Sequence, residues 1–231
     1  MQVLDCQVHS LTPLTPFVYK VILKASEKVE FIPGQYLNFV MGEEDKRPFS
    51  IASTPGSEFI ELQIGAFGED SWAMQVIDRL KSSDTVQVEV AFGEAYLRED
   101  SERPLILLAG GTGFSYIKSM FEHLANTQSK RHIMVYWGLR EPKAVYELEE
   151  TQKIIDSLPH ANFTPVVEFS DDTWSGRSGL VHKAVMEDIV SLEPYDIYMA
   201  GRCDMVGVLR EDFIKHGALV EHMYADAFAF I

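Results

Sequence analysis

The hydrophobic pattern of this chain changes period once, inside the polar segment 94–103, and this change constrains the fold more than any other feature. Before it, short runs such as Phe59–Ile64 alternate apolar and polar residues, as strands with one buried face do. After it, strands such as Leu105–Ala109 are apolar throughout and alternate with stretches of helical period. We therefore predict two domains, an antiparallel β-barrel over residues 1–99 and an α/β domain over residues 100–231.

The first predicted domain contains short strands separated by Pro-Gly and Phe-Gly turns, and one helix whose apolar residues recur every four positions. The second resembles a Rossmann domain, with a parallel sheet and helices on both faces. The predicted strands are Val18–Leu23, Gln35–Val40, Pro48–Ala52, Phe59–Ile64, Val86–Val90, Leu105–Ala109, Ile133–Trp137, Thr164–Val167 and Ile197–Ala200, and the predicted helices are Ser71–Leu80, Tyr116–Ala125, Val145–Leu158, Val181–Val190 and Val206–His216.

The charge of the chain argues against polyanionic partners. Asp and Glu number 35 against 20 Lys and Arg, for a formal net charge of −15. Affinity for nucleic acid depends on cations that displace counterions from phosphates, so we expect neither nucleic acid nor an anionic membrane as a partner. The longest apolar runs fall far below the ~18 residues of a membrane span, and the N-terminus lacks the pattern of a signal peptide. We therefore expect a cytoplasmic protein.

Cysteine and histidine are too sparse for a metal centre. The chain has two cysteines, Cys6 and Cys203, with no C-x-x-C pair, and its seven histidines lack H-E-x-x-H spacing. We expect no disulfide framework, no bound metal and no iron–sulfur cluster. Cys203 is expected to be a small buried residue rather than a catalytic thiol.

The strongest local motif is a glycine-rich turn between a buried strand and a helix, made of Gly110, Gly111, Thr112 and Gly113. Glycine leaves backbone N–H groups accessible to a phosphate, and the helix N-terminus beyond adds positive potential. The turn thus resembles a site for a dinucleotide pyrophosphate. Tyr116 occupies the third glycine position of the full G-x-G-x-x-G fingerprint, and a tight structural connection is the alternative.

A second glycine turn, Ala200-Gly201-Arg202, follows a later strand. Ligands of open α/β sheets bind outside the carboxyl ends of the strands, so the two turns are predicted to face each other across one crevice. The alternative is that Gly201 ends the strand and Arg202 is solvated.

The first domain contains the tetrapeptide Arg47-Pro48-Phe49-Ser50. Arg47 supplies a planar cation and Ser50 a hydroxyl that can donate or accept a hydrogen bond. Taken alone, this motif is best explained as a strand with a hydroxyl that faces solvent.

The order of these motifs resembles the ferredoxin–NADP reductase superfamily, and within it the NAD(P)H:flavin oxidoreductases of the Fre and LuxG type. The similarity covers essentially the whole chain. It is carried by Gly34-Gln35-Tyr36, Lys46–Pro55, Gly93–Arg98, Ala109–Tyr116, Tyr136-Trp137-Gly138, Ala200–Met205 and the C-terminal run from Asp226 to Ile231.

The resemblance implies roles for individual residues. Ser50 would be catalytic, with its hydroxyl hydrogen-bonded to flavin N5, the hydride acceptor. The residues implied to bind flavin are Arg47, Pro48, Phe49, Ser50 and Ile64, those implied to bind the nicotinamide nucleotide are Gly110, Gly111, Thr112, Gly113, Ala200, Gly201 and Arg202, and the C-terminal candidates at the same site are Asp226 and Phe228. For Phe228 and Phe230, however, core packing is the preferred interpretation.

The function implied by the resemblance is reduction of FMN, FAD or riboflavin by NADH or NADPH. Glu69 and Asp70, near the start of the first predicted helix, would repel a flavin phosphate, so we expect flavin to be a dissociable substrate. Reduced flavin would then serve ferric iron reduction, a monooxygenase or a luciferase in luminescence. One alternative is a reductase with tightly bound FAD and a protein partner, and another is a non-catalytic nucleotide-binding subunit. Arg140 either meets the 2′-phosphate of NADPH or is solvated, which leaves the choice of nucleotide open.

Overall fold

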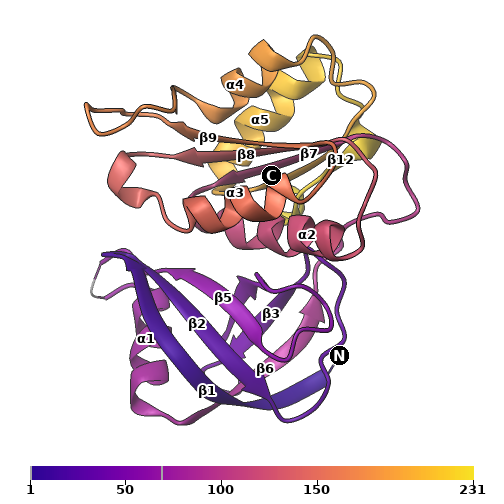
Figure 1. The fold of residues 1–231 in the computed structure, drawn as a ribbon. Helices are drawn as coiled ribbons and strands as arrows, with labels where there is room; N and C mark the ends of the chain where they lie inside the picture. Colours follow the sequence, from indigo (N-terminus) through magenta and orange to yellow (C-terminus); the bar gives the residue numbers. More distant parts are fainter. Residues whose placement is uncertain (1, 69) are drawn as a thin grey trace.

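The N-terminal strands form one antiparallel sheet that rolls into a barrel (Figure 1). This computed structural model describes residues 2–68 and 70–231. The sheet has the order β4-β3-β6-β1-β2-β5. Its edge strands approach each other, and just beyond β4 the Ala52 N–H donates to the Glu61 carbonyl at 2.8 Å. The strands are β1 (Gln2–Thr15), β2 (Val18–Ala25), β3 (Tyr36–Val40), β4 (Lys46–Ser50), β5 (Ile60–Gly65) and β6 (Thr85–Phe92).

Alternation of apolar residues fills the barrel, and one helix covers it. In β2, for example, Val21 and Leu23 are fully buried. Helix α1 (Trp72–Ser82) begins where the Ser71 hydroxyl accepts a hydrogen bond from the Met74 N–H. Its apolar face, spaced three to four residues apart, packs into the barrel core with Ala73, Val76, Ile77 and Leu80.

The second domain contains a parallel sheet in the order β10-β9-β8-β7-β11-β12. Helices α2 and α3 lie on the face toward the barrel, and α4 and α5 cover the other face (Figure 1). The strands are β7 (Leu105–Gly110), β8 (Ile133–Leu139), β9 (Ala161–Val167), β10 (Arg177–Ser178), β11 (Asp196–Ala200) and β12 (Met223–Tyr224), and the helices are α2 (Phe114–Asn126), α3 (Leu148–Asp156), α4 (Val181–Asp188) and α5 (Cys203–Lys215). The short 3-10 helices are η1 (Gly111–Gly113), η2 (Pro142–Ala144), η3 (Val220–His222) and η4 (Asp226–Ala229).

The burial of both faces of strand β7 explains why its sequence lacks polar alternation. Leu105 and Leu107 belong to the cluster beneath α2 and α3, while Ile106 and Leu108 belong to the cluster beneath α4 and α5. Both faces of the strand are therefore covered, so both need apolar side chains.

The segment between the domains is fixed to the α/β domain at both ends. Ala95 and Leu97 are buried in the same cluster as α2. Farther along, the Ser101 hydroxyl donates to the buried carboxylate of Asp196 at 2.6 Å, and Arg131 donates to the same oxygen at 2.8 Å. The boundary at 99/100 falls inside this segment and stays a prediction.

The order of the predicted elements is confirmed, with three additional strands and two shorter helices, α3 and α4. Strands β1, β10 and β12 were not predicted. The helix predicted over Val145–Leu158 begins only at Leu148, because Glu147 takes a left-handed conformation with φ 48°. Among the described residues, no helix is long and apolar enough to cross a membrane.

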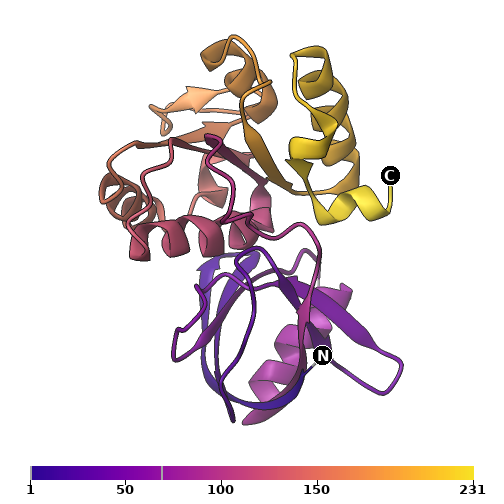
Figure 2. The ribbon, with the colours of Figure 1, turned by 90° about the vertical axis from the view of Figure 1, so that its right-hand side faces the viewer.

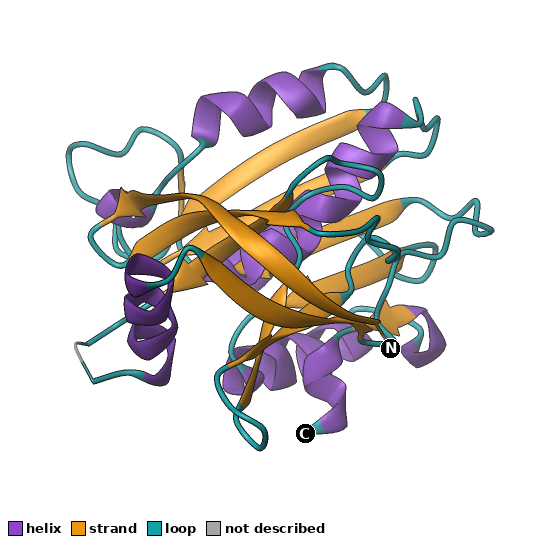
Figure 3. Ribbon diagram, turned by 90° about the horizontal axis from the view of Figure 1, so that it is seen from below, coloured by secondary structure: helices purple, strands orange, loops and turns teal. Residues whose placement is uncertain are grey.

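The C-terminal segment descends toward the barrel at the junction of the two domains (Figure 2). Seen from below, the rolled strands of the barrel cross in front of the α/β domain (Figure 3). The junction thus brings β4 close to the last residues of the chain.

Candidate active site

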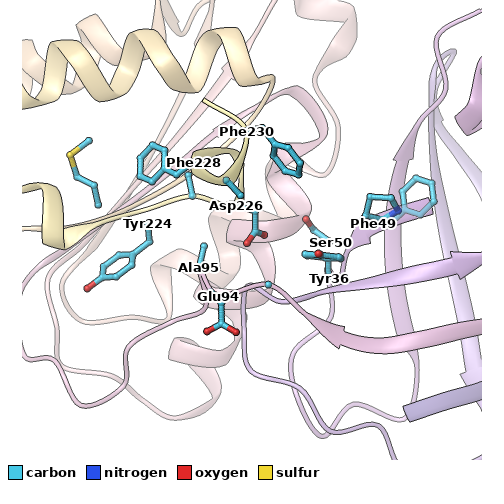
Figure 4. A pocket seen from close by; sticks show the side chains of 14 residues that line it. Tyr36, Phe49, Ser50, Glu94, Ala95, Tyr224, Asp226, Phe228 and Phe230 are labelled. Atoms are coloured by element: carbon cyan, nitrogen blue, oxygen red, sulfur yellow. The ribbon is translucent and has the colours of Figure 1, made fainter. Parts of the chain in front are cut away.

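A pocket of about 650 Å³ lies at this junction. Strands β3 and β4 form its barrel side, and the C-terminal segment forms its other side (Figure 4). Its volume lies within the ~300–1,000 Å³ typical of small-molecule sites. The lining residues are Tyr36, Pro48, Phe49, Ser50, Gly93, Glu94, Ala95, Met223, Tyr224, Ala225, Asp226, Phe228, Ala229 and Phe230.

Strand β4 brings Ser50 to this pocket. Its register pairs Ser50 with Tyr36 of β3, so both lie at the pocket end of the ladder. Pro48, which has no N–H to donate, is accommodated because β4 is an edge strand. Phe49 also lines the pocket, and its ring packs against Trp72 of α1 at 5.4 Å between centroids. The aromatic lining suits a flat, largely apolar ring system such as isoalloxazine.

Arg47 uses its guanidinium on partners within the barrel. It donates to both carboxylate oxygens of Asp45, at 2.8 and 2.6 Å, and to the Gln75 side chain at 2.8 Å. It also donates to the Trp72 carbonyl. The Asp45 carboxylate holds the pKa of Arg47 above its ordinary value. Arg47 therefore ties β4 to the start of α1, and a flavin phosphate would have to compete with Asp45 for its charge.

Asp226 contributes a carboxylate to the pocket from the C-terminal side. Figure 4 shows it converging with Ser50 and Tyr36 from the opposite wall. Gly93 has φ +98°, a conformation that favours glycine, and a Cβ there would lie 3.1 and 3.2 Å from the two Asp226 oxygens, so the carboxylate packs closely against this glycine. Burial raises the pKa of Asp226, a hydrogen bond from the Ala95 backbone opposes that rise, and Glu94 adds to it.

Among the described residues, the pocket lining carries acidic groups and no Lys, Arg or His. Glu94 and Asp226 are its two ionisable carboxylates. A neutral ring gains contact with the aromatic walls, whereas a phosphate would gain no ion pair from the lining. The pocket therefore fits the ring of a flavin better than its phosphate.

The first glycine turn is predicted to hold a phosphate, and its backbone is compatible with that role. Gly111 has φ +53°, a conformation that glycine adopts freely, and a Cβ there would meet open space. The indole N–H of Trp137 donates to the Gly111 carbonyl at 2.9 Å and thereby attaches the turn to β8. The turn runs directly into α2, whose N-terminal N–H groups favour an anion.

The second glycine turn lies against the first. Strands β7 and β11 are adjacent and parallel, and Ala109 pairs with Ala200 at their carboxyl ends. A Cβ on Gly113 would lie 2.7 Å from the Ala200 carbonyl carbon and oxygen, so the two turns are in contact. The chain leaves β7 toward β8 on one side and returns to β11 on the other, which makes this the topological switch point where open sheets bind ligands.

Two cations near these turns have partners or neighbours within the chain. Arg202 precedes α5 and is paired with Asp204, to which its Nε donates at 3.0 Å. Arg140 follows β8 and lies over the Phe169 ring at 5.8 Å. Neither contact distinguishes NADH from NADPH.

The two candidate sites are linked through the end of β5. A Cβ on Gly65 would lie 3.0 Å from Thr112, so the nucleotide turn rests on the barrel strand beside it. Ile64, the preceding residue, has a fully buried side chain in the barrel core and does not line the pocket. A flavin contact through its backbone stays a prediction.

Several expectations need correction. Cys203 is exposed, because it is the first residue of α5 at the domain surface. Phe230 is 80% exposed at the pocket rim instead of packing in the core, whereas Phe228 is partly buried. The first turn of α1 contains no acidic residue, since Asp70 precedes its cap. Glu69 lies outside the described residues.

The sequence motifs did not single out the rest of the pocket lining. Tyr36, Gly93 and Glu94 lie in runs that carried the family resemblance, and those runs were the available signal. Tyr224 follows no motif and reaches the site only because β12 pairs with β11. In the described part of the chain, no group of three or more His, Cys, Asp or Glu side chains is placed to hold a metal ion.

Comparison with known proteins shows full-length similarity to flavin reductases. Residues 107–211 match the family model of the oxidoreductase NAD-binding domain. The chain is 43% identical over 235 residues to the NAD(P)H-flavin reductase of Vibrio harveyi and 42% identical over 235 residues to that of Aliivibrio fischeri, with 99% of each chain covered in both cases. The ferredoxin reductase in carbazole 1,9a-dioxygenase has a similar fold, with a TM-score of 0.87, 21% identity, and coverage of 98% of this chain and 69% of the other.

Proposed function

This chain belongs to the NAD(P)H-flavin reductases, oxidoreductases of the ferredoxin–NADP reductase superfamily, and we propose that it reduces free flavin and releases the product. The hydride moves from C4 of the reduced nicotinamide to N5 of the oxidised flavin. The nicotinamide loses two electrons, and the flavin gains them together with a proton from solvent. The protein supplies binding and orientation for this step.

The pocket lining is the observation that supports a dissociable flavin. Its two carboxylates, Glu94 and Asp226, would repel a phosphate, and the nearby cation of Arg47 is already paired with Asp45. Flavin binding then depends on ring contacts with residues such as Phe49. Riboflavin, FMN and FAD share that ring, so we propose that all three are substrates.

Within this proposal, Ser50 donates a hydrogen bond to flavin N5, and Gly110–Gly113 with Ala200–Arg202 hold the nicotinamide nucleotide. The contact between Gly65 and Thr112 supports this arrangement, because it places the nucleotide turn beside the barrel. Asp226 lies across the pocket from Ser50, where it would border the nicotinamide ring.

Reduced flavin released in this way can reduce ferric complexes or supply a monooxygenase or luciferase. We propose ferric iron and such an oxygenase as its acceptors. No contact with the acceptor is required, since the carrier is a small molecule that diffuses.

An anaerobic titration of NADH and NADPH against riboflavin, FMN and FAD tests the proposal, after the absorbance spectrum of the purified protein is recorded. We expect little bound flavin and turnover with each free flavin. A ferric chelate behind a dialysis membrane should be reduced, because the carrier crosses the membrane. Protein that retains stoichiometric FAD and does not reduce the separated chelate would instead support a reductase with a protein partner.

The role of Ser50 is tested by Ser50→Ala. Loss of the N5 hydrogen bond should lower the hydride-transfer rate about 10- to 100-fold, because small displacements of reacting atoms are costly. The Kd of NADH should stay the same. Ser57→Ala, in an exposed turn of the same domain, serves as the control. An unchanged rate in Ser50→Ala would remove Ser50 from the mechanism.

A further inference from the structure

Helix α2 lies on the face of the α/β domain toward the barrel (Figure 1). It presents a stripe of polar side chains to the barrel. Ser115, Lys118, Ser119 and Glu122 recur at helical spacing on this side, and the first three are buried. The Ser119 hydroxyl donates to the Ser53 carbonyl of the barrel at 2.7 Å. The domain interface is therefore built from directional contacts as well as packing.

Lys118 lies at the centre of this stripe, with only 8% of its side chain exposed. Its Nζ lies 2.6 Å from Glu61 Oε1, 3.4 Å from Glu122 Oε1 and 3.5 Å from Glu147 Oε2. These carboxylates come from three separate elements: β5 of the barrel, α2 itself and the residue before α3. One ammonium group therefore joins the barrel strand to two parts of the α/β domain.

A second cation and an amide complete the cluster. Lys20 of β2 contacts Glu147 Oε1 at 2.6 Å and Glu61 Oε2 at 3.6 Å. The Gln63 amide donates to Glu61 at 3.1 Å and to Glu147 at 2.8 Å, and its oxygen accepts from Tyr146 at 3.2 Å. Both faces of the junction thus contribute to one connected network.

The charges in this network make it specific for one arrangement of the domains. Burying ions is costly, so such clusters add little net stability compared with apolar packing. Removing one partner leaves an uncompensated charge, however. Displacing one domain relative to the other would also separate the partners and leave their charges uncompensated. The cluster therefore disfavours other orientations more than it favours folding.

The cluster lies between the two candidate binding sites. Lys118 is one turn and a half along α2 from Gly113, the last residue of the nucleotide turn. On the barrel side, the Glu61 carbonyl accepts from Ala52, two residues after Ser50. A shift at Lys118 would consequently move the nucleotide turn relative to β4.

We propose that Lys118, through its ion pairs with Glu61 and Glu147, is a positioning residue that sets the distance between the nucleotide turn and the flavin pocket. Its effect on catalysis rests on the proposed function, since it acts on hydride transfer between ligands bound at these two places. Lys118 itself touches neither ligand site.

Kinetics of Lys118→Met test the catalytic consequence. In anaerobic single turnovers at saturating NADH and riboflavin, the hydride-transfer rate should fall about tenfold or more, because misplacement of about 1 Å is that costly. The Kd of each ligand should change less than about twofold, since both sites keep their own residues. The reaction amplitude separates the fraction of folded protein from the rate. Lys24→Met, which breaks the exposed pair with Glu58 at 2.9 Å, is the matched control and should keep the wild-type rate.

A double variant separates positioning from stability. Lys118→Met with Glu61→Gln removes the cation and the nearest of the carboxylates it compensates, so the unfolding temperature should recover part of the way toward that of the wild type. The hydride-transfer rate should stay low, because the link between α2 and β5 is still missing. Recovery of the rate together with stability would overturn the proposal.

Domain geometry gives a readout that does not need activity. Cys203 is exposed, whereas burial raises the pKa of Cys6 to about 11, so a thiol-specific spin label attaches to Cys203. A second label at Ser57→Cys lies in an exposed turn of the barrel. The distance distribution between the labels should be narrow in the wild type and with Lys24→Met, and broader with Lys118→Met and with the double variant. An unchanged distribution in both would refute the positioning role, whereas wild-type protein that reduces no free flavin would refute only the proposed function.

Discussion

Asp226 shows how one residue couples the pocket to folding. Its carboxylate extends from the C-terminal segment, is partly buried beside Gly93, and accepts a hydrogen bond from the Ala95 N–H. Burial dominates and raises its pKa, so the folded protein holds this proton more tightly than the unfolded chain does. Ionisation of Asp226 therefore costs folding free energy, and this cost develops as pH rises from the unfolded pKa through the raised folded one.

Asp226→Asn should remove that cost. The unfolding temperature of the variant should equal that of the wild type at about pH 3, where both states are protonated, and exceed it at about pH 7. The excess should be a few degrees at most, since about 1 kcal/mol shifts the unfolding temperature of a chain this size by about 2–4 °C. Thermal unfolding monitored by circular dichroism across this pH range measures the difference.

Asp171 provides a control, because its pKa is shifted in the opposite direction from that of Asp226. Hydrogen bonds from the Thr173 hydroxyl and backbone lower the pKa of this exposed carboxyl. Its stabilising contribution is present above the unfolded pKa and is lost as pH falls through the folded one. Asp171→Asn should thus be slightly less stable than the wild type at neutral pH. A decrease in both variants would show that Asp226 is not the source of a pH-dependent cost.

At the scale of elements, the two glycine turns depend on contact between backbones. Gly113 has an ordinary right-handed conformation, with φ −55°, so its backbone conformation does not require glycine. It is required for space, because a Cβ would lie 2.7 Å from the Ala200 carbonyl. A side chain at this position must push β7 and β11 apart at the ends that form the nucleotide crevice.

Gly113→Ala should therefore weaken NADH binding by about tenfold or more while riboflavin binding stays the same, since displaced amides no longer meet the phosphates. Isothermal titration of each ligand measures this split. Gly207→Ala in α5 is the matched control, because its Cβ would meet only Ile231 at 3.8 Å. That variant should bind normally and gain about 0.5–1 kcal/mol from better helix propensity. Equal NADH affinity in Gly113→Ala and the wild type would contradict the role of the turn.

The sequence predicted elements with regular patterns and missed those with interrupted ones. Strand β7 was predicted because both of its faces are apolar. The turn after it was predicted because three glycines within four residues are typical of a tight turn. Strand β1 was missed because irregularities between Val8 and Ser10 and between Pro13 and Thr15 break its period of two. The early start predicted for α3 failed because Val145 and Tyr146 keep helical spacing but pack at the domain junction before the left-handed Glu147.

Contacts between distant residues could not be predicted from local patterns. The proximity of Asp226 and Gly93 depends on how the C-terminal segment crosses the junction. No local sequence pattern indicates that Lys118 is buried, and its burial follows only from docking α2 onto the barrel. The motifs thus pointed to the candidate residues of β4 and of the glycine turns, whereas Asp226 and Phe228 on the opposite wall were candidates only through the family resemblance.

At the scale of the whole molecule, the net charge of −15 acts against the charged ligands that this family uses. FMN carries a phosphate and riboflavin does not, while both present the same ring to the pocket. The two flavins therefore separate the general repulsion of an acidic protein from the local contacts with the ring.

Added salt should improve FMN binding relative to riboflavin binding. Raising the ionic strength from about 0.01 M to about 0.15 M shortens the Debye length from about 30 Å to about 8 Å, which screens the general repulsion. The Kd of FMN should fall by about two- to tenfold, because the negative potential of the protein repels the doubly charged phosphate and salt weakens that repulsion. The Kd of riboflavin, which has no phosphate, should stay nearly constant. Fluorescence titrations of both flavins at each ionic strength measure the ratio. If salt instead weakens FMN binding, Arg47 must release Asp45 and pair with the phosphate, and local attraction would then outweigh the charge of the molecule.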